Sequence, residues 1–157
     1  MKSQLTIAAA MLASATTAKQ DICRALVLSG GGNNGAWEAG VLYGMLANGN
    51  AADFAFDVVT GVSAGAMNAG GLAGWEVGRE LEAAQFLSDT WLGFSTSDIW
   101  TDWALGKVSG VLLMGGTVDN APLLNTLQDL ISQFDGYHRR MTIAAVDVET
   151  GNYVEFD

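Results

Sequence analysis

Residues 24–47, RALVLSGGGNNGAWEAGVLYGMLA, decide the fold of this chain of 157 residues. Residues 24–29 form a short apolar run without polar alternation, which is typical of a strand covered on both faces. The glycine-rich loop 30–35 follows this run. Residues 36–47 then carry apolar side chains at helical spacing and end at an Asn-Gly stop. The stretch therefore predicts a strand, a glycine loop and a helix.

A second unit of the same kind occupies residues 56–75, FDVVTGVSAGAMNAGGLAGW. The apolar run 56–62 predicts a strand, and residues 64–75 predict a helix whose small side chains let neighbouring backbones approach closely. Two successive strand-to-helix units favour a parallel sheet packed between helices. The expected fold class is α/β, with three α/β/α layers around a mainly parallel central sheet.

The middle of the chain is less regular. Residues 75–91 have the pattern of a helix, whereas residues 94–116 mix tryptophans with Ser, Thr, Asp and Gly and predict no regular element. Pro122 suits the first turn of a further helix that runs to Ile131, with Asn120 as its N-cap.

The C-terminal part predicts two paired strands. Residues 140–148 read as a strand, residues 149–152 as a turn and residues 153–156 as the partner strand. Because the chain stops at the edge of this strand, we expect a fold truncated at its C-terminus. The predicted domain, residues 24–157, is therefore expected to be incomplete.

Composition favours one globular domain with an acidic surface. Half of the residues are hydrophobic (50%), and 17 acidic residues against 7 basic ones give a formal net charge of -10. Such a charge repels phosphate backbones, so nucleic acid is not an expected partner. A lipid remains a possible substrate, because a local apolar patch can meet a membrane or micelle surface transiently.

The first 18 residues predict an export signal. Lys2 gives a positive start, residues 5–15 are apolar, and residues 16–18 form a small-residue end before a cleavage site after Ala18. The alternative, an anchoring helix, is disfavoured because the apolar run is too short to span a bilayer. We therefore expect a secreted protein or one in the secretory-pathway lumen.

Metal and disulfide chemistry have little support in the sequence. Cys23 is the only cysteine, so no internal disulfide can form, and we expect it to pack as a small apolar residue. His138 is the only histidine, and there is no CxxC pair. No metal site and no cofactor are predicted.

Ser63 is the first candidate for chemistry, because it is the serine of a Gly-x-Ser-x-Gly segment formed with Gly61 and Gly65. A nucleophile on a sharp strand-to-helix turn is held in a strained conformation and needs neighbours with almost no side chain. The helix that follows favours the negative charge that develops in acyl transfer. The alternative is a tight packing turn with an incidental serine.

The glycine loop has two possible uses. Its N–H groups can form an oxyanion hole for a tetrahedral intermediate. The loop also satisfies the G-x-G-x-x-G pattern of dinucleotide-binding turns, in which Asp53 or Asp57 would be the ribose-binding acid.

Taken together, LSGGGNNGAWEAGVL (residues 28–42) and TGVSAGAMNA (residues 60–69) resemble the patatin-like phospholipase family, and the resemblance extends more weakly through residues 117–123 and 144–151. It implies an α/β/α fold and a Ser-Asp dyad that hydrolyses acyl esters of lipids without a metal cofactor. By position, Ser63 would be the nucleophile. Three residues would contribute the oxyanion hole: Gly30, Gly31 and Gly32.

The chain departs from the family pattern at two points: a positive charge in the glycine loop and the catalytic aspartate. Asn34 stands where the family usually has Arg or Lys. The family's Asp-Gly-Gly or Asp-Gly-Ala motif does not occur, so the catalytic aspartate is expected outside this chain. Asp147 belongs to a segment that resembles another part of the family, and Asp157 has no glycine after it. Neither is assigned as the base.

A Ser-His-Asp triad would need His138, which lies beside two arginines in a polar approach to a strand and is expected on the surface.

The favoured function is a serine hydrolase acting on phospholipids or related acyl lipids. The alternatives are a non-catalytic lipid- or partner-binding module of the same fold and, less favoured, a dinucleotide-binding protein.

Four aromatic residues have two alternative roles. They are Trp91, Phe94, Trp100 and Trp103. They could form an apolar approach to a lipid surface, since tryptophans favour interfaces. The more common role for such residues is packing in a core or lid.

Overall fold

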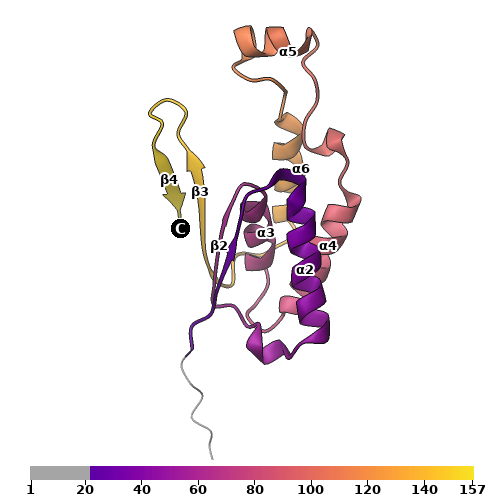
Figure 1. The fold of residues 1–157 in the computed structure, drawn as a ribbon, viewed down its shortest axis with the longest axis vertical. Coiled ribbons are helices and arrows are strands. Elements are labelled where there is room, and N and C mark those ends of the chain that lie inside the picture. Colours follow the sequence, from indigo (N-terminus) through magenta and orange to yellow (C-terminus); the bar gives the residue numbers. More distant parts are fainter. Residues whose placement is uncertain (1–21) are drawn as a thin grey trace, which may run out of the picture.

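The computed structural model describes residues 22–157, which form an α/β fold on one four-stranded sheet (Figure 1). The strands are β1 (Ala25–Leu28), β2 (Val58–Val62), β3 (Arg140–Val146) and β4 (Tyr153–Phe156), in the order β1-β2-β3-β4. The first three are parallel, and β4 pairs antiparallel with β3. The predicted mainly parallel sheet is confirmed. The predicted export signal lies outside the described residues.

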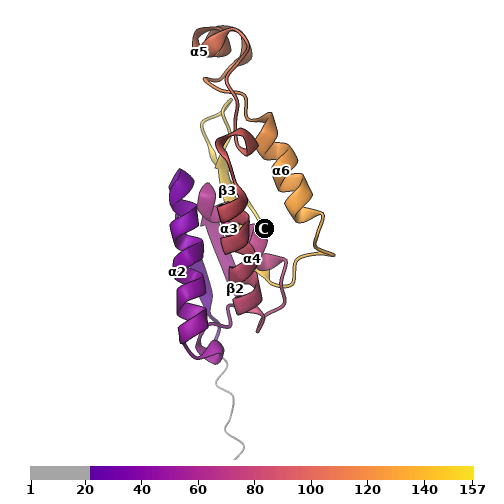
Figure 2. The ribbon, with the colours of Figure 1, turned by 90° about the vertical axis from the view of Figure 1, so that its right-hand side faces the viewer.

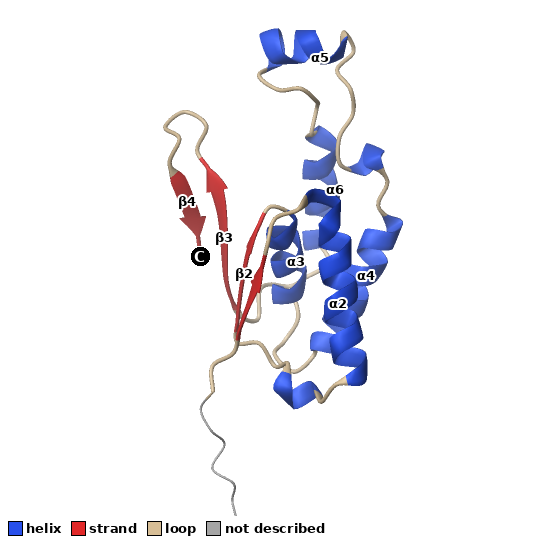
Figure 3. Ribbon diagram, in the orientation of Figure 1, coloured by secondary structure: helices blue, strands red, loops and turns tan. Residues whose placement is uncertain are grey.

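Four helices cover one face of the sheet, as Figures 2 and 3 show. They are α2 (Gly35–Asn48), α3 (Ala64–Ala73), α4 (Glu80–Gly93) and α6 (Ala121–Ile131). The short elements are η1 (Gly32–Asn34), η2 (Ala51–Asp53), η3 (Thr96–Asp98), α5 (Gly106–Ser109) and the π-helical turn η4 (Gly110–Met114). Among the described elements, no helix is both long and apolar enough to cross a bilayer.

The core lies between the sheet and these helices. Strand side chains alternate between the two faces, so Leu28 points toward the helices together with Val59, which is fully buried. Leu42 of α2 and Leu72 of α3 pack against them from the helical side.

The opposite face of the sheet carries no helix from residues 22–157. Val27 is 75% exposed and Val62 is 42% exposed on this face. The prediction that the first strand is covered on both faces is therefore wrong for the described part of the chain, which supplies two of the three expected layers. Cys23 also differs from expectation, since it is exposed rather than packed.

The helix predicted from residue 75 begins at Glu80 instead. Gly78 has φ 100°, a conformation that interrupts a helix, and its N–H donates to the Glu80 carboxylate (2.8 Å). The α6 helix begins as predicted, but Asn120 makes no side-chain cap. Asp119 takes that role by accepting a hydrogen bond from the N–H of Ala121 (3.0 Å).

A buried ion pair joins the helical layer to the sheet at the end opposite the glycine loop. The Arg139 guanidinium lies 2.8 Å from the Glu80 carboxylate, and its other bonds go to carbonyl oxygens of Phe56, Trp75 and Glu76. All donors of this arginine are used, so its role is structural.

Candidate active site

Ser63 occupies a strained turn between β2 and α3. Its φ of 55° and ψ of -123° make it the only non-glycine residue with positive φ among residues 22–157. An L-residue in such a conformation costs roughly 1–3 kcal/mol and persists only where the surroundings enforce it. Strain of this kind is a feature of nucleophile turns.

Gly61 and Gly65 allow this turn to form. A Cβ at position 61 would collide with the backbone of Gly65, and a Cβ at position 65 would lie 2.6 Å from the carbonyl carbon of Leu28. Real Cβ atoms do not approach backbone atoms so closely. The first turn of α3 therefore packs directly on the end of β1, and both neighbours of Ser63 in the motif must be glycine.

The glycine loop lies beside Ser63. A Cβ at Gly30 would be 3.1 Å from the Ser63 Cβ and 3.9 Å from its Oγ. Gly32 has φ 58°, and the carbonyl of Gly31 accepts a hydrogen bond from the N–H of Asn34 (3.1 Å). The two loops that the sequence singled out are thus brought together at the carboxyl ends of adjacent parallel strands.

The start of α3 adds a polar contribution at the same place. Its first residue is Ala64, so the positive end of the helix dipole and unpaired N–H groups lie next to the serine. This arrangement stabilises an anion that forms close to Ser63.

A hydrogen-bond network connects the glycine loop to three helices. The Glu38 carboxylate of α2 accepts from the N–H of Ser29 (2.9 Å) and from its hydroxyl (3.1 Å). The amide of Asn68 in α3 donates to the same carboxylate (3.2 Å) and to the carbonyl of Gly35 (3.0 Å). The indole N–H of Trp91 in α4 donates to the Asn68 amide oxygen (2.7 Å).

Sequence reasoning missed Glu38 and Asn68. Asn68 is 1% exposed, and buried polar groups of this kind are costly unless they are fully hydrogen-bonded. The available signal was a lone amide in a helix otherwise built of Ala, Gly, Met and Leu. Its partners lie 30 and 23 residues away, so only the fold identifies them.

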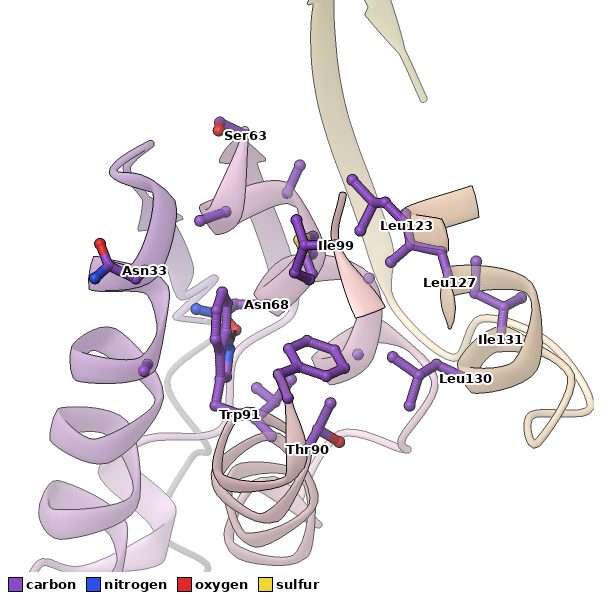
Figure 4. Close-up of a pocket in the computed structure, with 18 of the residues that line it drawn as sticks. Asn33, Ser63, Asn68, Thr90, Trp91, Ile99, Leu123, Leu127, Leu130 and Ile131 are labelled. Carbon is purple, nitrogen blue, oxygen red and sulfur yellow. Dashed lines mark hydrogen bonds between the residues drawn. The ribbon is translucent and has the colours of Figure 1, made fainter. Parts of the chain in front are cut away.

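A large apolar cavity opens next to Ser63 (Figure 4). Its volume of about 920 Å³ lies in the usual range of ligand pockets, roughly 300–1,000 Å³. Trp91 and Leu87 of α4 form one wall, and Leu123, Leu127 and Leu130 of α6 form the facing wall. No Asp, Glu, His, Lys or Arg lines this cavity in the described part of the chain.

None of the four aromatic residues is fully exposed, and three of them line this cavity. Trp91, Phe94 and Trp100 line it, and Trp91 packs edge to face with Phe94 at 5.5 Å between ring centroids. Trp103 is half-buried in the loop that follows. Of the two roles left open by the sequence, these contacts favour packing.

A smaller hollow lies on the other side of the glycine loop. Its volume is about 300 Å³, and its lining includes Gly30, Gly31, Asn34, Trp37 and Glu38. The glycine loop therefore separates an apolar cavity from a more polar one.

Three titratable residues that could serve as a base have other partners. Asp147 accepts from the Thr150 hydroxyl (2.7 Å) and the N–H of Glu149 (2.9 Å), and these bonds lower its pKa. Asp157 accepts from the Thr142 hydroxyl (2.6 Å). The His138 ring nitrogen Nε2 lies 3.0 Å from the Asp135 carboxylate. The backbone N–H of His138 donates to the carbonyl of Ala73, at the far end of α3, about 15 Å along the helix from Ser63.

The acids considered for ribose binding lie at the wrong edge of the sheet. Asp57 precedes β2 and accepts a hydrogen bond from the N–H of Arg24 (2.9 Å), while Asp53 lies in η2. Dinucleotides bind at the carboxyl ends of parallel strands, where the glycine loop lies. Among residues 22–157, no group of three His, Cys, Asp or Glu side chains is arranged to hold a metal ion.

Comparison with known proteins gives one match. The family model described as patatin-like phospholipase matches residues 26–153. No curated protein and no solved structure matches the chain.

Proposed function

Because the chain belongs to the patatin-like phospholipase family, a family of lipid acyl hydrolases, we propose that Ser63 is the nucleophile that cleaves carboxylic esters of phospholipids or related acyl lipids. One observation carries this proposal. The strained Ser63 lies against Gly30, beside the apolar cavity.

The reaction proceeds by acyl transfer to Ser63. Its hydroxyl loses a proton to a base as Oγ attacks the ester carbonyl carbon, and the carbonyl oxygen becomes the oxyanion of a tetrahedral intermediate. Collapse of the intermediate breaks the ester C–O bond, and the alcohol leaves with the proton from the base. Water, deprotonated by the same base, then attacks the acyl-serine; the acyl C–Oγ bond breaks, the base returns the proton to Ser63 Oγ, and the fatty acid is released.

The oxyanion is stabilised by backbone N–H groups of the glycine loop, Gly30, Gly31 and Gly32, together with the start of α3. Of the three, Gly30 lies against Ser63, where a Cβ would be 3.1 Å from the Ser63 Cβ. Removing one such donor from a hydrolase typically costs about 100- to 1,000-fold in kcat.

The two hollows suggest how the ester is oriented. The acyl chain occupies the cavity between α4 and α6, whose lining is mostly apolar, and the alcohol portion lies toward the smaller hollow beside Trp37. The base is an aspartate that is not among these 157 residues. Two observations support this: within residues 22–157 no acid lines the cavity, and Asp147 and Asp157 are bound elsewhere.

We further propose that the protein is exported, on the basis of residues 1–18 alone. Mass spectrometry of the protein recovered outside the producing cell should give an N-terminus at Lys19. Recovery of an intact Met1 terminus would contradict this proposal.

The central test is labelling of the full-length gene product by a fluorophosphonate probe, together with release of fatty acid from phospholipid micelles. Ser63→Ala should abolish both, whereas Ser132→Ala, at an exposed serine at the end of α6, should change neither. His138→Ala should also retain labelling. If His138→Ala were as inactive as Ser63→Ala, a triad would replace the dyad.

Absence of both labelling and hydrolysis in the full-length product would contradict an enzymatic role. The non-catalytic lipid-binding module would then be the better explanation for the cavity. Binding of a fluorescent fatty acid in the cavity, lost on substituting Leu127→Asp, would identify that function.

A further inference from the structure

Residues 105–114, here called the apolar tip, project from the body of the protein (Figure 1). Six large apolar side chains of the tip are more than half exposed: Leu105 (81%), Val108 (74%), Val111 (56%), Leu112 (76%), Leu113 (72%) and Met114 (62%). Contiguous exposed apolar surface of this kind marks an interaction site in a soluble domain.

The tip is held in shape at its base. Thr101 and Asp119 exchange two backbone hydrogen bonds of 2.9 Å each, which close the excursion. Inside it, the indole N–H of Trp103 donates to the carbonyl of Gly116 (3.0 Å), and Gly110 packs against the same ring. The aromatic side chain thus faces inward, while the aliphatic side chains remain outside.

The position of the tip relates it to Ser63. The parallel strands β1, β2 and β3 end at the edge of the sheet where Ser63 lies, and the tip projects beyond that same edge (Figure 1). The segment that leads into the tip also forms part of the cavity, through Phe94, Ile99 and Trp100. The tip is therefore continuous with the wall of the proposed acyl site.

Charge distinguishes the tip from the rest of the chain. The formal net charge is -10, yet the single charged residue between Trp103 and Thr117 is the cation Lys107. Carboxylates would oppose entry into an apolar phase, whereas a lysine can extend its ammonium group to the phosphate level. The acidic body disfavours a strongly anionic surface.

We propose that the apolar tip inserts into the surface of a zwitterionic lipid assembly and holds the Ser63 edge of the protein against it. The proposal rests on the proposed function, because a lipid substrate resides in such an assembly. It commits to lipid rather than protein as the occupant. Continuity with the cavity and the absence of acidic residues in the tip favour lipid.

The experiment measures binding to phosphatidylcholine vesicles by flotation, with Ser63→Ala in every protein so that hydrolysis plays no part. The double substitution Leu112→Asp, Leu113→Asp should weaken binding at least about tenfold, since each leucine loses apolar burial and gains a charge. The matched control is Leu81→Asp, at a 42% exposed leucine in the first turn of α4, at the other end of the molecule. It should leave binding unchanged.

A second variant strengthens the interaction instead of removing it. Leu112→Trp should bind phosphatidylcholine vesicles more tightly, because tryptophan favours the membrane interface. Its thermal unfolding, and that of the double variant, should match the parent protein because the substituted side chains are mostly exposed.

Equal vesicle binding by the double variant and the Leu81→Asp control would overturn the proposal. So would a self-associated protein in which the double substitution releases monomers without affecting vesicle binding, since the tip would then contact a second copy. Failure of the proposed function is separate: it appears as absence of fluorophosphonate labelling at Ser63, whatever the vesicle result.

Discussion

A Cβ at Gly65 would lie 2.6 Å from the carbonyl carbon of Leu28, so the first turn of α3 is in direct backbone contact with the end of β1. We predict that Gly65→Ala destabilises the protein by more than the ~1–3 kcal/mol of ordinary overpacking, because the obstacle is backbone that cannot rotate away. Fluorophosphonate labelling should be lost as the turn shifts. Urea denaturation and labelling of the same samples test both effects.

Gly70→Ala, in the same helix, is the matched control. A Cβ at Gly70 meets nothing within 4 Å, so the substitution should stabilise the protein by roughly 0.5–1 kcal/mol. Similar stability changes for the two variants would mean that the contact between Gly65 and Leu28 does not constrain the turn.

Asn68 supplies a second prediction, because it connects Glu38 of α2 with Trp91 of α4. Asn68→Leu preserves the size of the side chain but leaves the Trp91 indole without its acceptor. We expect a loss of about 1–3 kcal/mol in the free energy of unfolding. We also expect a slower rate of labelling at Ser63, since Glu38 positions the glycine loop through Ser29.

The double variant Asn68→Leu, Trp91→Phe separates the two effects of this substitution. Trp91→Phe removes the unpaired donor, so part of the stability should return, while labelling should remain slow. If the rate of labelling instead recovered with stability, the network would be structural only.

The buried pair of Arg139 and Glu80 leads to a third prediction. Their side chains are 0% and 2% exposed, so Arg139→Met should cost about 3–5 kcal/mol by leaving the Glu80 carboxylate unpaired. Replacing both residues, with Glu80→Leu added, should recover only part of that loss, because three carbonyl oxygens still lack their donor. Chemical denaturation of the single and double variants measures the difference.

The exposed pair of Arg79 and Glu82 provides the comparison. Their side chains are about half exposed (52% and 51%), and water screens such pairs strongly. Glu82→Gln should therefore give no measurable change in stability. A change as large as that of Arg139→Met would contradict the argument from burial.

The sequence predicted the parts of this fold whose signals are local. The strand, loop and helix order around Gly30 and Ser63 follows from apolar runs that end in glycines, and the structure has both units. The start of α4 was not predicted because it depends on the positive φ of Gly78. The burial of Arg139 depends on its contact with Glu80, 59 residues away, which no local pattern indicates.

The same distinction between local and long-range signals applies to the candidate site. The resemblance to the family implied that the glycine loop and Ser63 form one site, and in the structure the carboxyl ends of adjacent parallel strands bring them together. The sequence could not predict that the Asn68 side chain is buried and bonded to Glu38. Nor could it predict that the exposed residues beyond the cavity are the aliphatic ones of the apolar tip rather than the tryptophans. Exposure is set by tertiary packing, which a local pattern does not encode.

Asp147 gives a pH-dependent prediction. The hydrogen bond from the Thr150 hydroxyl, and to a smaller extent the one from the N–H of Glu149, hold the pKa of this carboxyl below its usual value. A lowered folded-state pKa means that the turn is stabilised above the unfolded-state pKa and loses this contribution as pH falls through the folded-state value. Hydrogen exchange at the amide of Glu149 should therefore be slowed at pH 5 and lose that protection as the carboxyl becomes protonated.

Thr150→Val tests the cause directly. Removing the hydroxyl should raise the Asp147 pKa, measured by NMR titration, and move the loss of protection to higher pH. Thr117→Val, at an exposed threonine elsewhere in the chain, should leave the titration of Asp147 unaltered. An unchanged midpoint in Thr150→Val would show that the hydroxyl is not the source of the shift.

The strain at Ser63 makes a final prediction that is independent of catalysis. Ser63→Ala keeps a Cβ at φ 55°, whereas Ser63→Gly removes it from a conformation that only glycine adopts easily. Relief of strain, roughly 1–3 kcal/mol, exceeds the extra unfolded-state freedom of glycine, so the glycine variant should be more stable by about 1 kcal/mol. At Ser132, where φ is -62° and ψ is -13°, the order should reverse, because right-handed backbone favours alanine. Denaturant unfolding of the four variants measures both differences. The same order at both positions would mean that the turn at Ser63 is not strained, and the argument for an enforced nucleophile conformation would fail.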